Sequence, residues 1–236
     1  MVASCRDPHC AHEPVTRAAQ GDWYICTTMV ASLPNRTRPR GAARREALLD
    51  AVLQVVADEG VDAVTHRRIA DVAGLPLAST TYYFESKEHL LTAALERAAD
   101  RDIERLHAFV HEAEERLAEA PGPERAADPL HLVVGAILDP VEDAGPTSRS
   151  LLLATYALML EAARRPALRA VTMRWTEAYW EALTPLLAAA GSRDPRSHAE
   201  LLLATADGLL VTQLATGDDS DVAPTLRQLA AALVNA

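Results

Sequence analysis

The stretch THRRIADVAGLPLASTTYYFESKEHLL, residues 65–91, contains two short helical patterns interrupted by Gly74 and Pro76. A threonine N-cap and the glycine bound the first helix, which is predicted over 65–73. Because a proline disfavours helical backbone in the residue before it, the second helix is predicted over 77–84. Two short helices joined by a tight turn are typical of units that place the second helix in the major groove of DNA. The spacing therefore predicts a helix-turn-helix unit.

An aromatic run ends the second short helix and precedes a solvated corner. Phe84 and one of the two tyrosines are predicted to fill a small core, since aromatic residues at helical spacing usually pack inside. Tyr82 is predicted to be the exposed ring, which can stack on a sugar or a thymine methyl group and bond a phosphate. Ser86 is predicted to cap the following helix, and Lys87 places an ammonium beside its free N–H groups. This corner is predicted to bind an anion.

A basic stretch and a supporting helix precede this unit. Residues 36–45 (RTRPRGAARR) contain five arginines and no acid, although the chain has a net charge of −10. One interpretation of the stretch is a solvated tail. The other is contact with phosphates or the minor groove, with Arg40 and Arg44 as candidates. Apolar residues at three- and four-residue spacing then predict an amphipathic supporting helix over 42–59.

From residue 65 to residue 91 the sequence resembles, without a gap, the DNA-binding signature of the tetracycline-repressor (TetR) family of one-component bacterial regulators. The resemblance implies a three-helix DNA-binding domain followed by a larger helical domain that binds a ligand and forms a dimer. It also implies contacts with a double-stranded DNA operator from these residues of the chain: Thr65, His66, Arg67, Leu77, Ala78, Ser79, Thr80, Thr81, Tyr82 and Lys87.

Three positions depart from the family's common pattern. Pro76 stands where a capping serine is common, Leu77 where a lysine is frequent, and Thr81 where the first tyrosine often lies. A recognition helix so poor in charge is predicted to read thymine methyls and groove shape more than guanine edges. The departures also keep an alternative open, which is a helical interaction or scaffold protein that has the fold but has lost DNA binding.

Proline and glycine residues divide the rest of the chain into further helical patterns, so an all-α fold with about nine helices is predicted. The predicted domains are a leader and basic arm at 1–39, a DNA-binding domain at 40–90, and an effector-binding and dimerisation domain at 91–236. The later helices are predicted over 87–120, 130–138, 147–165, 167–190, 196–216 and 225–234.

The segment 201–214 (LLLATADGLLVTQL) is apolar nearly all round, which predicts burial on more than one side. In the TetR family the last two long helices form a four-helix bundle across the dimer, and the last two predicted helices are in that place. The resemblance therefore implies a homodimer, which a palindromic operator also requires. Asp207 has two interpretations here: a hydrogen bond inside the dimer seam, or a polar anchor in a ligand cavity.

Most aromatic residues of the C-terminal part gather at Trp175, Tyr179 and Trp180. One interpretation is core packing. The other is a pocket for a small-molecule effector, in which Glu161 or Glu177 would favour a cationic or amphipathic ligand. The candidate effector-binding residues are Phe109, Tyr156, Met159, Trp175, Tyr179 and Asp207.

Composition excludes several classes of protein. Hydrophobic residues make up 49% of the chain and aromatic residues only 4%, with alanine and leucine dominant, which favours helices. No apolar run reaches the roughly 20 residues that span a bilayer, and the first residues lack a signal peptide's apolar core. A cytoplasmic protein without membrane contact is predicted. No nucleophile elbow, phosphate-binding glycine loop or catalytic pair of acids is present, so neither enzymatic activity nor a cofactor is expected.

Cys5, His9, Cys10 and His12 are residue types that bind zinc, and they lie close together near the start of the chain. All four fall within eight positions, and no hydrophobic run follows that could fold around an ion. A disordered leader is therefore favoured over a zinc site, and no metal is predicted. Met29 begins a stretch that looks like an ordinary N-terminus, so an upstream start codon is a second explanation of the preceding residues.

Together these patterns predict a DNA-binding transcriptional regulator, a repressor that a small apolar or amphipathic effector releases from its operator.

Overall fold

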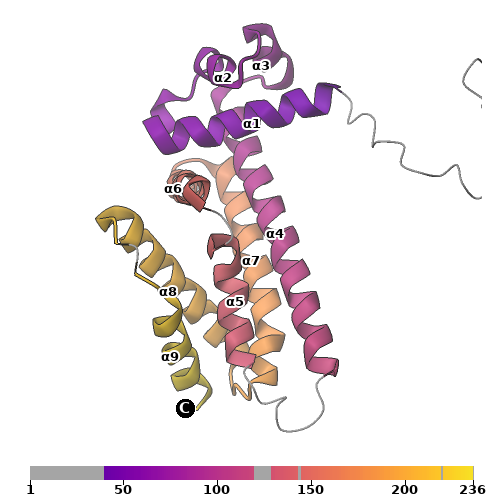
Figure 1. Cartoon of the computed structure of the whole chain (residues 1–236). Coiled ribbons are helices and arrows are strands. Elements are labelled where there is room, and N and C mark those ends of the chain that lie inside the picture. Colours follow the sequence, from indigo (N-terminus) through magenta and orange to yellow (C-terminus); the bar gives the residue numbers. More distant parts are fainter. Residues whose placement is uncertain (1–39, 120–128, 143–144, 219, 236) are drawn as a thin grey trace, which may run out of the picture. The chain divides into compact units, whose positions relative to one another are not determined.

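The computed structural model describes residues 40–119, 129–142, 145–218 and 220–235, and all regular structure in these ranges is helical. The all-α prediction is confirmed (Figure 1). The predicted leader and its cysteines lie outside the described residues. The helices are α1 (Arg40–Glu59), the 3₁₀ helix η1 (Val61–Ala63), α2 (His66–Ala73), α3 (Leu77–Tyr83), α4 (Lys87–Glu119), α5 (Pro129–Glu142), α6 (Gly145–Glu161), α7 (Pro166–Ala189), α8 (Pro195–Thr216) and α9 (Ala223–Val234).

Two helix ends differ from their predicted places by four residues, and the other bounds agree within two. The helix α5 was expected to stop at Leu138, but Pro140 lies within its last turn and the helix continues to Glu142. The helix α6 was expected to reach Arg165 and ends earlier. Arg165 has extended backbone, with φ −122° and ψ 103°, because the following proline disfavours the helical conformation there.

Local capping sets the bounds of the short helices, as the sequence predicted. The Thr65 hydroxyl accepts a hydrogen bond from the Arg68 backbone N–H at 3.1 Å, which caps α2. Gly74 then adopts the left-handed conformation, with φ 63°, and ends α2. At the start of α4, the Ser86 hydroxyl accepts from the His89 N–H at 3.1 Å.

The N-terminal helices share one core. Phe84 is 1% exposed and packs with Leu48, Leu49 and Ile69, so its predicted core position is confirmed. The helix α1 contacts α2, α3, α4 and also α6. The described residues pack as one compact unit, and α4 runs unbroken past residue 90, where a domain boundary is predicted from the sequence.

The remaining helices pack mainly on α7, which contacts α4, α5, α6 and α8, while α9 contacts α5 and α8. One close approach depends on a glycine: a Cβ atom on Gly135 of α5 would lie 2.6 Å from the Phe109 ring of α4. In the part of the chain that the structure describes, no helix is long and apolar enough to cross a membrane.

Candidate nucleic-acid interface and buried cavity

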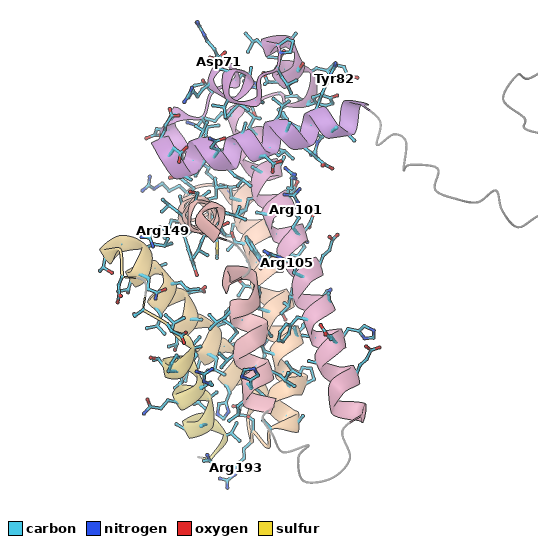
Figure 2. The ribbon with its side chains drawn as sticks, viewed as in Figure 1. Asp71, Tyr82, Arg101, Arg105, Arg149 and Arg193 are labelled. Atoms are coloured by element: carbon cyan, nitrogen blue, oxygen red, sulfur yellow. The ribbon has the colours of Figure 1, made fainter. Side chains whose placement is uncertain are left out.

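The helix α3 has one exposed face. Leu77 is 49% exposed and Tyr82 is 80% exposed, and Ala78 and Thr81 are exposed as well. These four residues, which we call the α3 face, follow the spacing of one side of a helix. Tyr82 is the exposed ring, as predicted, and packs edge-on against Tyr83 at 4.9 Å between ring centroids (Figure 2).

Thr80 points the other way, and its predicted contact with DNA needs correction. Its side chain is fully buried, on the same side of α3 as Phe84 four residues later. The Thr80 hydroxyl donates to the Leu77 carbonyl at 2.8 Å, so its polar group is satisfied within the helix. Ser79 is half-buried and lies at the edge of the α3 face.

Basic residues lie on α1 and α2, two helices that contact α3. Arg67, in the first turn of α2, is exposed and has no ion-pair partner among the described residues. The next residue, Arg68, donates from Nε to Glu59 of α1 at 2.9 Å, so its charge is paired within the protein. Arg44 is exposed on α1, and the side chain of Arg40 lies outside the described residues.

Lys87 is half-buried at the start of α4, where its ammonium donates to the Asp62 carbonyl at 3.1 Å. An ammonium carries three N–H donors, so this bond fixes the lysine and leaves donors for a second partner. His66 is half-buried, and its Nδ1 atom has no hydrogen-bond partner in the described part of the chain. Thr65 is exposed beside it.

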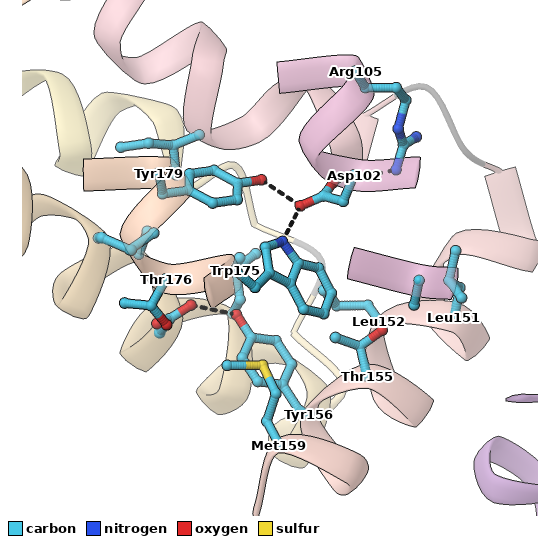
Figure 3. Close-up of a pocket in the computed structure, with 16 residues that line it drawn as sticks. Asp102, Arg105, Leu151, Leu152, Thr155, Tyr156, Met159, Trp175, Thr176 and Tyr179 are labelled. Carbon is cyan, nitrogen blue, oxygen red and sulfur yellow. Dashed lines mark hydrogen bonds and ion pairs between the residues drawn. The ribbon is translucent and has the colours of Figure 1, made fainter. Parts of the chain in front are cut away.

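A cavity of about 110 Å³ lies among α4, α5, α6, α7 and α8 (Figure 3). It is lined by five of the six candidate effector residues: Tyr156, Met159, Trp175, Tyr179 and Asp207. Phe109 is not among the lining residues, because its ring packs against Gly135. Most of the remaining lining residues are aliphatic.

Asp102 of α4 is the residue that sequence reasoning missed. Its side chain is almost buried, and its Oδ2 atom accepts from the Trp175 indole N–H and the Tyr179 hydroxyl, both at 2.7 Å (Figure 3). Its Oδ1 atom accepts from Arg105 at 3.4 Å. The sequence could have indicated it, because Asp102 is an acidic residue on the apolar stripe of α4, between the buried residues Leu95 and Leu106.

Asp207 is the second carboxyl group in the cavity wall. It accepts a hydrogen bond from the Tyr156 hydroxyl at 2.9 Å. Burial raises the pKa of Asp207, and the bond from Tyr156 partly opposes that change. Burial, followed by the charge of Asp207, raises the pKa of Tyr156, and burial together with Asp102 does the same for Tyr179.

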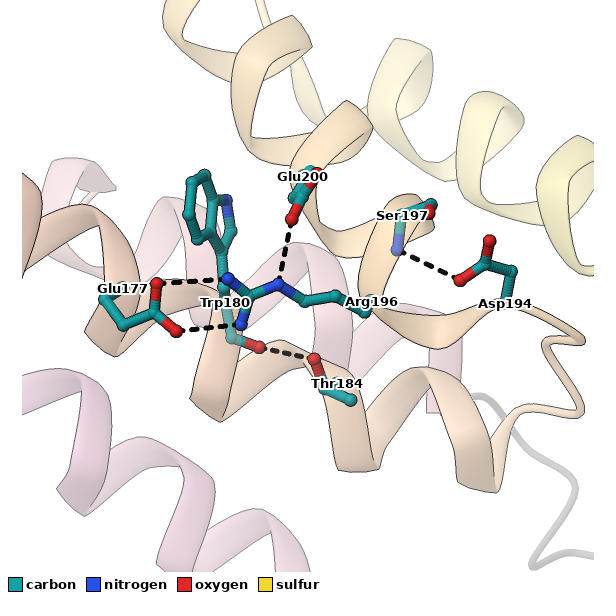
Figure 4. Close-up of polar contacts among 7 residues, drawn as sticks. All are labelled: Glu177, Trp180, Thr184, Asp194, Arg196, Ser197 and Glu200. Carbon is teal, nitrogen blue, oxygen red and sulfur yellow. Dashed lines mark hydrogen bonds and ion pairs between the residues drawn. The ribbon is translucent and has the colours of Figure 1, made fainter.

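The two glutamates expected to favour a cationic ligand do not line this cavity. Glu177 binds Arg196 through two hydrogen bonds of 3.0 Å, which hold the pKa of its carboxyl below the usual value (Figure 4). The guanidinium of Arg196 also lies 4.5 Å from the centre of the Trp180 ring. Glu161 accepts from Arg165 at 2.9 Å. Both glutamates are therefore paired with arginines, and Asp102 and Asp207 are the acids of the cavity.

One side of α8 is exposed although it carries no charge. Leu202, Leu203, Ala206 and Leu210 are buried against the rest of the chain. On another side, five exposed residues recur at three- and four-residue spacing, and we call them the α8 stripe: Leu201, Ala204, Gly208, Val211 and Ala215.

Comparison with known protein families matches two parts of the chain. Residues 48–94 match the family described as "Bacterial regulatory proteins, tetR family", and residues 131–236 match "Tetracyclin repressor-like, C-terminal domain". The HTH-type transcriptional regulator BetI of Rhizobium meliloti (strain 1021) is 50% identical over 52 residues, which are 22% of this chain and 26% of that protein. The matches span 26 to 39% of the curated relatives' own length.

Solved structures resemble nearly all of the described chain. A member of the TetR family from Streptomyces coelicolor A3, SCO1917, is 30% identical, with a TM-score of 0.58, and the match covers 80% of this chain and 97% of that one. The multidrug binding protein EbrR complexed with ethidium is 29% identical, with a TM-score of 0.58, over 84% of this chain and 99% of that one.

Proposed function

This chain belongs to the TetR family of transcriptional regulators, and from that premise we propose that it binds a specific DNA duplex through α3 and that a small organic cation in the cavity controls this binding. The observation that carries the DNA-binding proposal is the α3 face, exposed on a helix whose opposite side is fixed in the core. Arg67 and Lys87 contact phosphates of the same duplex. The contacts proposed for Arg44, Thr65, His66 and Ser79 are positioning contacts of the same kind.

A homodimer supplies the second recognition helix. The α8 stripe is uncharged and exposed in the single chain, and its small residues allow a second helix to approach closely. Two copies joined by this stripe can present two α3 helices to successive major grooves, which lie about 34 Å apart on a duplex.

The cavity supports a cationic effector. Asp102 is bonded to Arg105, but Asp207 has no cationic partner within the described ranges, so a cationic ligand would supply one. The rings of Tyr156, Trp175 and Tyr179 can pack on a flat cation. EbrR, which this chain resembles, binds ethidium and malachite green, both of them aromatic cations.

The effector can lower affinity for DNA only if it prefers the spacing of the two α3 helices that does not fit successive grooves. Two helices connect the cavity with the DNA-binding unit. The helix α4 carries Asp102 and begins at Lys87, while α6 carries Tyr156 and Met159 and packs directly on α1. We infer that movement of both helices transmits occupancy of the cavity.

DNA binding is tested by fluorescence polarisation with duplexes from the gene's own upstream region and from a random-sequence selection. We expect selective binding that weakens as salt rises. Tyr82→Ala and Arg67→Ala should each raise the dissociation constant about tenfold, and Arg67→Ala should also lower the salt slope by about one. Arg164→Ala, which removes an exposed charge from the α6–α7 turn, is the control and should change neither quantity. Failure to select any duplex would favour the scaffold alternative.

Effector binding is tested with ethidium, a permanent cation, in the absence of DNA. Burial raises the pKa of Asp207, so its charge is complete above that pKa and is lost as the pH falls through it. Affinity for ethidium should therefore decrease as the pH is lowered through this raised pKa. Asp207→Asn should weaken binding on the order of tenfold at pH 8 and remove most of the pH dependence. Equal affinities for the two proteins at pH 8 would contradict the assignment of Asp207.

A further inference from the structure

We propose that the α3 face recognises thymine methyl groups, so that the preferred DNA half-site is defined by the positions of thymines and not by hydrogen bonds to purines. This inference rests on the proposed DNA binding and adds the chemistry by which a base sequence is chosen. It concerns Leu77, Ala78, Thr81 and Tyr82, the four exposed residues of α3.

The α3 sequence, LASTTYY, contains no side chain that can form a paired hydrogen bond with a purine. Arginine and lysine recognise guanine through O6 and N7, while asparagine and glutamine recognise adenine through N6 and N7. None of these residues occurs between Leu77 and Tyr83. The polar atoms on this helix are hydroxyl groups alone.

The structure removes most of these hydroxyl groups from direct reading of bases. Thr80 is buried, and its hydroxyl donates to Leu77. The Thr81 hydroxyl donates to the Ala78 carbonyl at 3.3 Å, which uses its hydrogen within the helix. Ser79 is half-buried at the edge of the face. What α3 offers to a groove is therefore the Leu77 side chain, two methyl groups, and the Tyr82 ring, whose hydroxyl is assigned to a phosphate.

The major groove offers one apolar group for this surface to cover, the C5-methyl group of thymine. Leu77 is 49% exposed in the free protein, so covering it with a methyl group removes apolar area from water on both partners. Arg67 and Lys87 are the proposed phosphate contacts, and such contacts fix the position of the helix without selecting a sequence. Selection therefore falls to the apolar residues.

The test replaces thymine by deoxyuridine, one position at a time, in a duplex recovered from the random-sequence selection. This change removes the methyl group and keeps every Watson–Crick hydrogen bond. We expect an increase of about fourfold in the dissociation constant at one or two positions of each half-site, and about 15-fold when equivalent positions in both half-sites are changed. Replacing the guanines of the half-sites by 7-deazaguanine, one at a time, should change the dissociation constant less than twofold.

Leu77→Ala identifies the side chain that carries the effect. Because Leu77 is half exposed, this variant should keep the melting temperature of the parent, which is measured first. At one thymine position the deoxyuridine penalty should disappear in Leu77→Ala and persist in Arg67→Ala, which weakens binding in general.

Two outcomes would overturn the inference, and they differ in what they leave standing. If deoxyuridine has no effect while 7-deazaguanine weakens binding tenfold, the protein still binds a specific duplex, but by purine edges. If the selection recovers no preferred sequence, the proposed DNA binding fails together with the inference.

Discussion

Replacing Asp102 by alanine is expected to lower the free energy of unfolding by about 2–4 kcal/mol. The change removes the acceptor of two buried donors, the Trp175 indole N–H and the Tyr179 hydroxyl, each bonded at 2.7 Å. A buried donor left without a partner costs about 1–3 kcal/mol. Urea unfolding of the purified variant and of the parent, followed by circular dichroism, measures the difference.

Asp100→Ala is the matched control, because Asp100 lies on the same helix two residues earlier. Its ion pair with Arg174, at 2.7 Å, joins two side chains that are both about half exposed. Such a pair contributes at most about 1 kcal/mol. If the two variants lost the same stability, Asp102 would not be the structural centre that its hydrogen bonds indicate.

Phe84→Ala is expected to cost about 3–5 kcal/mol, the usual range for removing a fully buried phenylalanine. The ring is 1% exposed in the core formed by α1, α2, α3 and α4. The Arg45 guanidinium lies 5.6 Å from its centre, and the His89 ring packs edge-on at 5.3 Å. Truncation therefore removes the support of α3 as well as apolar contacts.

Tyr82→Ala, two residues earlier, should show the opposite pattern. Its ring is 80% exposed, so the melting temperature should stay within about 2 °C of the parent value while affinity for DNA falls. Thermal unfolding of both variants, together with the polarisation measurement above, separates the core aromatic residue from the exposed one. A large loss of stability in Tyr82→Ala would show that this ring supports α3 from outside.

Both Asp102 and Asp207 can act in the cavity, but in different ways. Asp102 joins α4 to α7 through Trp175 and Tyr179, so a ligand that displaces either ring disturbs the contact between these helices. Asp207 has only the Tyr156 hydroxyl as a partner in the described residues, so its carboxyl group can still bind a ligand. Asp102 is therefore suited to transmitting ligand binding to the helices, and Asp207 is suited to recognising the ligand.

Local sequence patterns were enough to predict the short helices and the exposed tyrosine. Thr65, Gly74 and Ser86 act on backbone groups within a few residues of themselves, so their effects can be read without knowledge of the rest of the fold. Helical spacing likewise assigned Phe84 to the core and Tyr82 to the surface. The same spacing places Thr80 on the side of α3 that carries Phe84. Its contact with DNA was instead predicted from the resemblance to the TetR signature.

Which side chains meet across helices can be seen only in the folded chain. Periodicity shows which side of α4 is buried, but not that Asp102 faces Trp175 and Tyr179 of α7 while Phe109, two turns further along, faces Gly135 of α5. Those pairings depend on the crossing positions of helices that are distant in the chain. The helices take these positions because all of their apolar surfaces must be buried at the same time. This requirement involves the whole chain and cannot be read from a local stretch of sequence.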